Sequence, residues 1–103
     1  MKIGGFDWDE GNRQKCQKHG LSLAEVEEAL ISAGHTILPD ERHSAEETRH
    51  IAIGRTSAGR LAFIAFTFRE KAGRLLMRPI SARFMHDKEV RKYEQEIARF
   101  LQR

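Results

Sequence analysis

Residues 49–82 read RHIAIGRTSAGRLAFIAFTFREKAGRLLMRPISA, and this stretch decides the fold class. Apolar and polar residues alternate over 49–54, which predicts a strand with one apolar face. Residues 61–68 are apolar on both faces, as in a central strand that is covered on both sides. Between them, Thr56–Gly59 offers a glycine for the positive φ of a hairpin turn. The two strands are therefore predicted to pair antiparallel.

The meander continues on both sides of this hairpin. Glu70–Gly73 predicts a second turn, followed by a last strand over Leu75–Ala82. Pro79 has no N–H to donate, so this strand is either at a sheet edge there or bulged. His35–Pro39 predicts a first strand, and a polar loop over 40–48 leads from it into the hairpin. The sheet should thus have about four antiparallel strands.

A first helix is predicted before the sheet. Asp7–Glu10 has the form of a capping box, and the helix should run to about His19, where Gly20 stops it. Gly11 and Asn12 disfavour a helix interior. The first helix should therefore be short and held by packing.

A second helix has clearer start and stop signals. Ser22 and Glu25 form a Ser-x-x-Glu capping box, with Leu21 and Val26 at the positions of a hydrophobic staple. Gly34 ends the helix.

A C-terminal helix is predicted over about Asp87–Leu101, with His86 at its N-cap and Glu89 three residues later. Its apolar residues fall on one face and should pack; they are Val90, Tyr93, Ile97, Phe100 and Leu101. The fold class is therefore α+β: two N-terminal helices, an antiparallel sheet, and a closing helix packed on the sheet.

Composition indicates one ordinary globular domain over residues 1–103, with 40% apolar and 32% charged residues. No apolar run approaches the ~18 residues of a membrane span, and no secretory signal is visible. Cys16 is the single cysteine, so the expected location is the cytoplasm. The net charge is +3, and basic residues gather in the second half of the chain, where a phosphate backbone would dock.

Several short motifs occur in a recognisable order and spacing. They are Phe6-Asp7-Trp8-Asp9-Glu10, Lys18-His19-Gly20, Arg42-His43-Ser44 with Glu47 and Arg49, and Ile80-Ser81-Ala82-Arg83 with Glu89 and Tyr93. In these motifs, which cover residues 6 to about 94, the chain resembles the BrnT family of toxins. The resemblance implies a RelE-like fold and a ribonuclease that arrests translation. It also implies a cognate antitoxin, BrnA, that neutralises the toxin and contacts operator DNA on behalf of the pair.

The residues expected to do the chemistry are Lys18, His19 and Arg83. Cleaving RNA without a metal requires activation of the 2′-OH, fixed positive charge at the phosphorane-like transition state, and a proton for the leaving oxygen. Lys18 and His19 have a structural alternative as cations at a helix C-terminus. For Arg83 the alternative is a salt bridge to Glu47 or Glu89.

Four arginines are expected to bind the RNA backbone: Arg49, Arg55, Arg69 and Arg78. Arg78 shares a groove with Arg83 only if Pro79 produces a bulge. Three further candidates are weaker: Glu47, His86 and Tyr93. Glu47 with Arg49 is more readily a surface ion pair than an acid–base pair, His86 a helix cap, and Tyr93 a packed side chain with a hydrogen-bonded hydroxyl.

No cofactor motif is visible, and the histidines and Cys16 lack the paired spacing of a metal site. The leading hypothesis is a metal-independent endoribonuclease with RNA and a BrnA-type antitoxin as partners. The alternative is a catalytically inactive module of the same fold that binds nucleic acid or protein.

Overall fold

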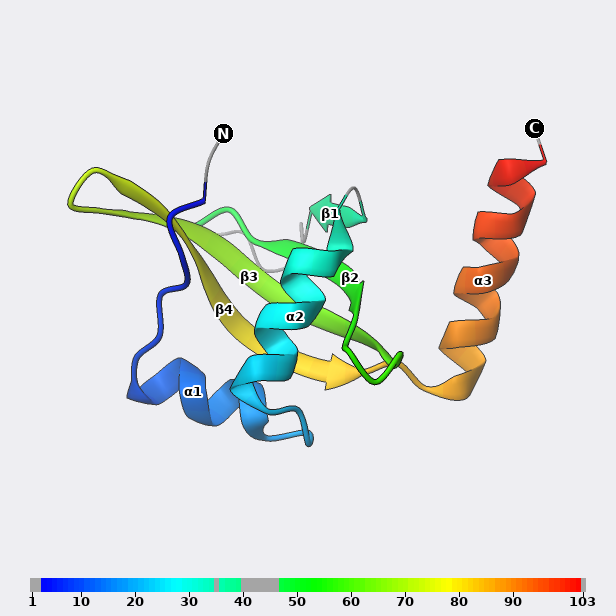
Figure 1. The fold of residues 1–103 in the computed structure, drawn as a ribbon, viewed down its shortest axis with the longest axis horizontal. Helices are drawn as coiled ribbons and strands as arrows, with labels where there is room; N and C mark the ends of the chain where they lie inside the picture. The colour runs from blue at the N-terminus through cyan, green and yellow to red at the C-terminus, as the bar shows by residue number, and fades with distance from the viewer. Residues whose placement is uncertain (1–2, 35, 40–46, 103) are drawn as a thin grey trace.

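The chain folds as two helices, a four-stranded sheet and a last helix, which confirms the predicted α+β class (Figure 1). The structure is a computed structural model that describes residues 3–34, 36–39 and 47–102. The elements are α1 (Glu10–Gln17), α2 (Leu23–Ala33), β1 (Ile37–Pro39), β2 (His50–Arg55), β3 (Leu61–Lys71), β4 (Arg74–Phe84) and α3 (Asp87–Leu101). Within the described residues, no helix has the length and apolar character that crossing a membrane requires.

The four strands follow one another in the order β1-β2-β3-β4, each antiparallel to the next, as predicted for a meander. The core lies between one face of this sheet and α2, which crosses it in Figure 1. Val26 of α2, with Ile64 and Phe66 of β3, is fully buried there. Removing each of these side chains from water stabilises the fold by roughly 1.5–3 kcal/mol.

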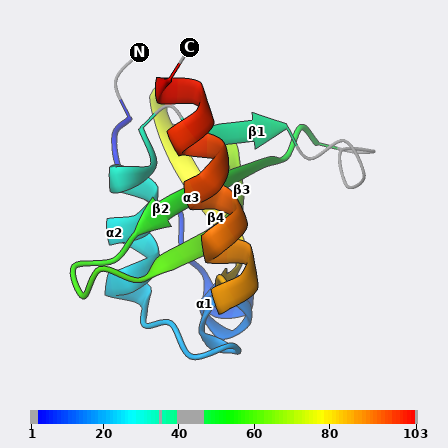
Figure 2. The same cartoon turned by 90° about the vertical axis from the view of Figure 1, so that its right-hand side faces the viewer.

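The prediction that β3 is covered on both faces holds for Leu61, which is 6% exposed, but not for Phe63 and Ala65. Phe63 and Ala65 point away from α2 and are only half-buried. The helix α3 does not supply the missing cover, because it stands apart at one end of the sheet (Figures 1 and 2). The face of the sheet opposite α2 is called the open face below.

The last strand is both an edge strand and bulged, so both interpretations of Pro79 hold. Ala65 pairs with Ser81 and Phe66 with Pro79, which leaves Ile80 as an extra residue in β4. The N-terminal segment runs along the outer edge of β4 and is bridged to it in parallel at Phe6.

The helix boundaries agree with the prediction except at α1. The N-cap is Asp9, with Asn12 completing its capping box, so the prediction that placed the box on Asp7–Glu10 was wrong. The helix ends at Gln17, before His19. For α2, the Ser22–Glu25 box and the stop at Gly34, with φ 57°, are confirmed. Leu21 and Val26, the predicted staple, are both buried.

The strands are longer than predicted at the second hairpin. It turns on Ala72 and Gly73 alone, with φ of 50° and 75°, instead of over Glu70–Gly73. The first turn is confirmed, with Gly59 at φ 85°. His35, predicted to begin the first strand, and most of the predicted loop lie outside the described residues, and β1 begins at Ile37.

The bounds of α3 are confirmed, but the predicted packing of its apolar face is not. None of its residues is buried, and Ile97, Phe100 and Leu101 are 42%, 68% and 76% exposed. Part of its apolar face lines a groove together with residues of α2, β2 and β3. Tyr93 is half-buried, and its hydroxyl lies 3.5 Å from Thr36 Oγ1.

Candidate functional site

A pocket of about 300 Å³ lies between α1 and the open face of the sheet. We call it the arginine pocket. Cations from three elements and one segment surround it, and among the described lining residues Glu47 is the one carboxylate. The lining residues are Gly11, Asn12, Lys15, Glu47, Arg49, Thr67, Arg69, Arg78, Pro79 and Ile80.

The bulge in β4 directs Arg78 toward this pocket. Arg78 pairs with Thr67 and Arg83 pairs with Phe63, two residues of β3 that are an even number of positions apart. Paired residues of neighbouring strands project to the same face of a sheet. Arg78 and Arg83 are an odd number apart, so they share the open face only because Ile80 is inserted between them. The bulge at Pro79 that Arg78 needs in order to share a face with Arg83 is therefore present.

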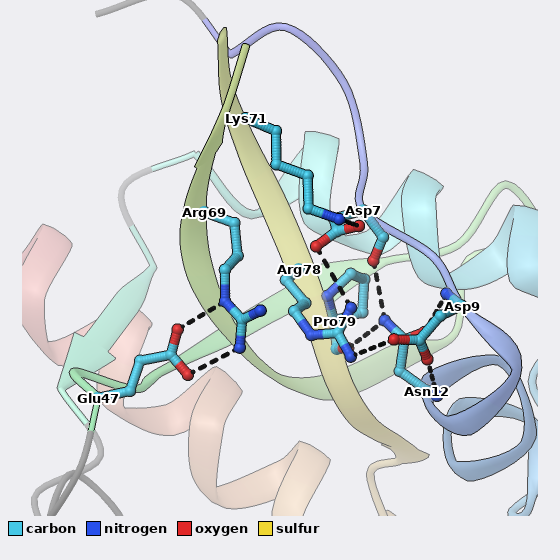
Figure 3. A network of polar contacts seen from close by, with 8 residues as sticks. All are labelled: Asp7, Asp9, Asn12, Glu47, Arg69, Lys71, Arg78 and Pro79. Carbon is cyan, nitrogen blue, oxygen red and sulfur yellow. Dashed lines mark hydrogen bonds and ion pairs between the residues drawn. The ribbon is translucent and has the colours of Figure 1, made fainter. Parts of the chain in front are cut away.

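Two carboxylates hold the guanidinium of Arg78 (Figure 3). One nitrogen donates to Asp9 Oδ2 at 2.6 Å and another to Asp7 Oδ2 at 3.3 Å. The side chain of Arg78 is 18% exposed and that of Asp7 is 6% exposed. Arg78 is therefore a partly desolvated cation that its partners hold in a fixed direction, and partial burial strengthens its interactions with nearby charges.

Lys71 completes the cluster by donating to Asp7 Oδ1 at 2.9 Å. The pKa of Asp7 is lowered, first by this hydrogen bond and also by the charges of Lys71 and Arg78, against the opposing effect of burial. The pKa of Asp9 is lowered mainly by the backbone N–H of Asn12, and then by Arg78. Both groups are therefore carboxylates at neutral pH.

A second arginine of the pocket, Arg69, donates two hydrogen bonds of 2.8 and 3.2 Å to the carboxylate of Glu47 (Figure 3). The pKa of Glu47 is lowered by this bond first, and further by the charges of Arg69, Arg49 and Arg78. Glu47 was expected to pair with Arg49, two residues away; the hydrogen bonds of its carboxylate go to Arg69. The charges of all three arginines nevertheless lower the pKa of this carboxylate, as expected when the three side chains line one pocket.

The arginine pocket suits a phosphate group. Guanidinium groups bind phosphate oxygens in bidentate fashion and keep their charge at any physiological pH. Lys15, Lys71 and the three arginines outnumber the carboxylates Asp7, Asp9 and Glu47. In a pocket partly closed to water, such fixed charge stabilises negative charge that develops during a reaction.

All three residues predicted to be catalytic, Lys18, His19 and Arg83, lie outside the residues that line this pocket. Lys18 is the C-cap of α1 and His19 lies in the following turn, both exposed. Arg83 donates to Glu89 at 2.8 and 2.9 Å and stacks 4.5 Å from the ring centre of Phe63. The salt bridge to Glu89 is thus confirmed, and it ties α3 to β4.

Arg55, His86 and Tyr93 lie away from the pocket as well. Arg55 donates to the carbonyl of Gly59 at 2.9 Å and, with Tyr93, lines an apolar groove beside α3. His86 is the N-cap of α3, and its backbone N–H donates to Glu89 at 2.9 Å. Its capping role is confirmed.

Cys16 and the acidic groups offer no other obvious reactive centre. Burial raises the pKa of the Cys16 thiol to about 11, so it stays protonated and a poor nucleophile. Among the described residues, no three His, Cys, Asp or Glu side chains are grouped to hold a metal ion.

The sequence pointed to Arg49, Arg69, Arg78 and Glu47, and the structure brings these four together. It did not point to Asp7, Asp9, Asn12 or Lys15 as parts of a site. One signal was available: Asn12 stands where a helix interior disfavours it, and such a residue often has a separate task.

The fold and the pocket define a small α+β protein whose arginines are arranged to receive a phosphate group. A comparison with known protein families matches residues 8–89 to the ribonuclease toxin BrnT of type II toxin–antitoxin systems. The chain therefore belongs to the BrnT family, which confirms the resemblance seen in its motifs. A search of curated proteins finds none that matches the chain.

Proposed function

We propose that this chain is a metal-independent endoribonuclease that binds the scissile phosphate of RNA in the arginine pocket and thereby arrests translation in the cytoplasm. Membership of a family of ribonuclease toxins supports the reaction class. The observation that carries the proposal is the convergence of Arg49, Arg69 and Arg78 on one pocket. Three guanidinium groups around a pocket of about 300 Å³ supply donors and positive charge for the oxygens of a phosphodiester.

The phosphate would replace Glu47 on Arg69 at small cost. Both side chains of this pair are about 40% exposed, with values of 42% and 37%. Ion pairs of such exposure contribute only ~0–1 kcal/mol. Arg69 is thus held ready by Glu47 and released to an incoming phosphate, and the freed carboxylate lies beside the site as a proton acceptor for the 2′-OH.

Arg78 would instead stay in place and stabilise the charge of the transition state. Its two carboxylate partners leave it little freedom, and preorganised donors are the most effective ones. Losing such a group typically slows a reaction by about 10²–10³-fold.

The remaining proton transfer is assigned to the end of α1. Lys15 lines the pocket from the last turn of α1, and Lys18, the C-cap, and His19, in the turn that follows, come three and four residues later in the chain. RNA that leaves the pocket across α1 meets these two side chains. We keep them as the candidate general acid and its supporting cation, whereas the pairing of Arg83 with Glu89 favours a structural role for Arg83.

One observation favours the alternative, a binding module without activity. Among the described residues that line the arginine pocket there is no histidine or tyrosine, so within the described part of the chain the candidate acid and base are Glu47 and groups beyond the rim. A protein that only binds would have the same arginines.

The experiment is an assay of the purified chain on ribosome-free RNA in excess EDTA. We expect cleavage that leaves 2′,3′-cyclic phosphate ends, because attack by the 2′-OH needs no metal. RNA binding without cleavage would establish the alternative, and the absence of both binding and cleavage would overturn the proposal.

The partner that neutralises the toxin is proposed to be a BrnA-type antitoxin, which alone contacts operator DNA. A type II system implies a protein antitoxin, and we expect it to cover the arginine pocket or an exposed sheet edge. Co-expression of the neighbouring gene should restore growth and block RNA cleavage by the purified pair.

A further inference from the structure

Asn12 is a polar residue that is buried, 5% exposed, in the first turn of α1. Its side-chain amide bonds only to backbone atoms (Figure 3). Nδ2 donates to the carbonyl of Pro79 at 2.8 Å and to that of Asp7 at 2.9 Å, while Oδ1 accepts from the N–H of Asp9 at 2.7 Å. One side chain thus joins α1, the segment before it, and β4.

The hydrogen bond from Asn12 to the Pro79 carbonyl takes the place of a backbone hydrogen bond from the N-terminal segment. Along the outer edge of β4, the carbonyls of Leu75 and Met77 accept from the N–H groups of Gly4 and Asp7, at 2.7 and 2.8 Å. Pro79 is two residues further on, where the N-terminal segment has already turned into α1. A buried carbonyl without a donor destabilises the fold, and the Asn12 amide supplies that donor.

The same bonds fix each part of the Arg78 cluster. Pro79 directly follows Arg78 and stands next to the inserted Ile80. The two carboxylates that hold Arg78 belong to Asp7 and Asp9, and Asn12 binds the backbone of both. The direction of the guanidinium therefore depends on one amide that does not touch it.

We propose that Asn12 is a positioning residue of the arginine pocket: its amide holds the β4 bulge and the backbone of the two carboxylates so that Arg78 points at the substrate phosphate. The role assigned to Arg78 rests on the proposed function. Asn12 acts through Arg78 and makes no contact with the reacting atoms.

The substitution Asn12→Ala should leave a folded protein. The backbone N–H of residue 12 donates to Asp9 Oδ1 at 3.0 Å, and this half of the capping box survives the change. Alanine also has the higher helix propensity. If Asn12→Ala nevertheless fails to fold, Asn12→Ser serves instead, since its hydroxyl is small and polar but too short to reach Pro79.

The matched control is Ser32→Ala. The hydroxyl of Ser32 also makes three contacts, two of which join a helix to a strand: its one proton is shared between the carbonyl of Arg55 at 2.8 Å and that of Ala29, in its own helix, at 3.1 Å, and its oxygen accepts from the Arg55 N–H at 2.8 Å. It lies outside the arginine pocket. Ser32→Ala should therefore cost similar stability without disturbing Arg78.

The first measurement is NMR of the Arg78 guanidinium N–H groups, assigned by comparison with Arg78→Ala. We expect resolved, slowly exchanging signals in the wild type and in Ser32→Ala, and averaged or missing signals in Asn12→Ala. Unchanged Arg78 signals in Asn12→Ala would overturn the inference, whatever the activity of the chain.

The second measurement is a double-mutant cycle on RNA cleavage. Asn12→Ala should lower kcat by about tenfold or more with a smaller change in KM, and should have no further effect in the Arg78→Ala background. Equal losses in both backgrounds would show that Asn12 does not act through Arg78. If the Arg78 signals respond to Asn12→Ala but Arg78→Ala cleaves as the wild type does, the positioning stands and the proposed function fails.

Discussion

The two groups that hold Arg78 in place are carboxylates, and these anions compete with the phosphate that Arg78 is proposed to bind. Asp7 is buried and shared with Lys71, so it belongs to the framework. Asp9 is 54% exposed and contributes a negative charge beside Arg78. The two carboxylates should therefore affect RNA binding differently, and Asp9 permits a clean test.

The substitution Asp9→Asn should tighten RNA binding. Asparagine is as good an N-cap as aspartate, so α1 keeps its start while one negative charge beside Arg78 disappears. We expect a gain of about two- to fivefold in affinity at low salt, the size of an exposed charge pair, and a smaller gain at high salt. Binding titrations would measure it.

The control for this prediction is Asp87→Asn, which removes the first-turn carboxylate of α3 and should not change affinity beyond the general effect of net charge. Weaker binding by a folded Asp9→Asn protein would contradict the prediction.

From the sequence, the residues of the pocket could be predicted better than the residues with which they form ion pairs. Arg78 was expected on the open face only if Pro79 caused a bulge, and the bulge is there. The role of Asp7 was missed because its partners, Lys71 and Arg78, are 64 and 71 residues away in the chain. Local signals such as a capping pattern contain no information about contacts of that range.

At the scale of elements, α2 and β2 approach each other closely at Gly54. A Cβ added there would lie 1.8 Å from the carbonyl oxygen of Ala29, which is backbone and has no room to move aside. The glycine is required by this close approach and not by its φ angle.

The substitution Gly54→Ala should destabilise the fold by about 3 kcal/mol or more, at the upper end of the cost of overpacking a core. Chemical denaturation would measure the change. The control is Gly59→Ala, where no atom lies within 4 Å but φ is +85°, and where the loss should be about 1–2 kcal/mol. A Gly54→Ala protein as stable as the wild type would show that the packing is wrong.

The bond between Arg83 and Glu89 connects β4 to α3 and should make that connection sensitive to pH. The pKa of Glu89 is lowered from 4.5 to about 2, first by the hydrogen bond from Arg83 and then by that from the His86 backbone. The folded chain thus binds this proton less readily than the unfolded chain. Its contribution to stability is present above about pH 4.5 and is lost as the pH falls toward about 2.

We therefore expect Glu89→Gln to lower stability at pH 7 and to have no effect near pH 2. Thermal unfolding at both pH values, with the exposed Glu96→Gln as control, would measure this. A difference that persists at pH 2 would contradict it. The pair also tests Arg83: if Arg83→Ala slows RNA cleavage and Glu89→Gln does not, Arg83 has a catalytic role beyond the ion pair.

Most element boundaries could be predicted, because capping residues, glycines and apolar alternation act locally. Ser22, Glu25 and Gly34 defined α2 correctly. The packing of α3 could not be predicted. Its apolar stripe indicates that one face is to be covered, but it does not identify the element that covers it. The prediction that both faces of β3 are covered failed in part for the same reason, because an apolar face in the sequence does not identify what packs on it.

At the scale of the whole molecule, the arginine pocket and the exposed apolar face of α3 involve different parts of the surface. The pocket lies beside α1 and the middle of β4, whereas α3 stands at one end of the sheet (Figure 1). Net charge alone, +3 over 103 residues, did not locate the pocket. It became visible only when the bulge and the antiparallel register brought Arg49, Arg69 and Arg78 together.

The most direct test of the central claim compares RNA cleavage, in EDTA, by the wild type, Arg78→Ala, Arg78→Lys and Arg91→Ala. Arg91 is an exposed cation of α3 outside the pocket and controls for lost charge. Arg78→Lys keeps a cation for Asp7 but loses the fork that grips phosphate. We predict that both Arg78 variants lose about a hundredfold in rate while Arg91→Ala stays within about twofold, the effect of an exposed charge. A folded Arg78→Ala protein that cleaves RNA at the wild-type rate would contradict the claim.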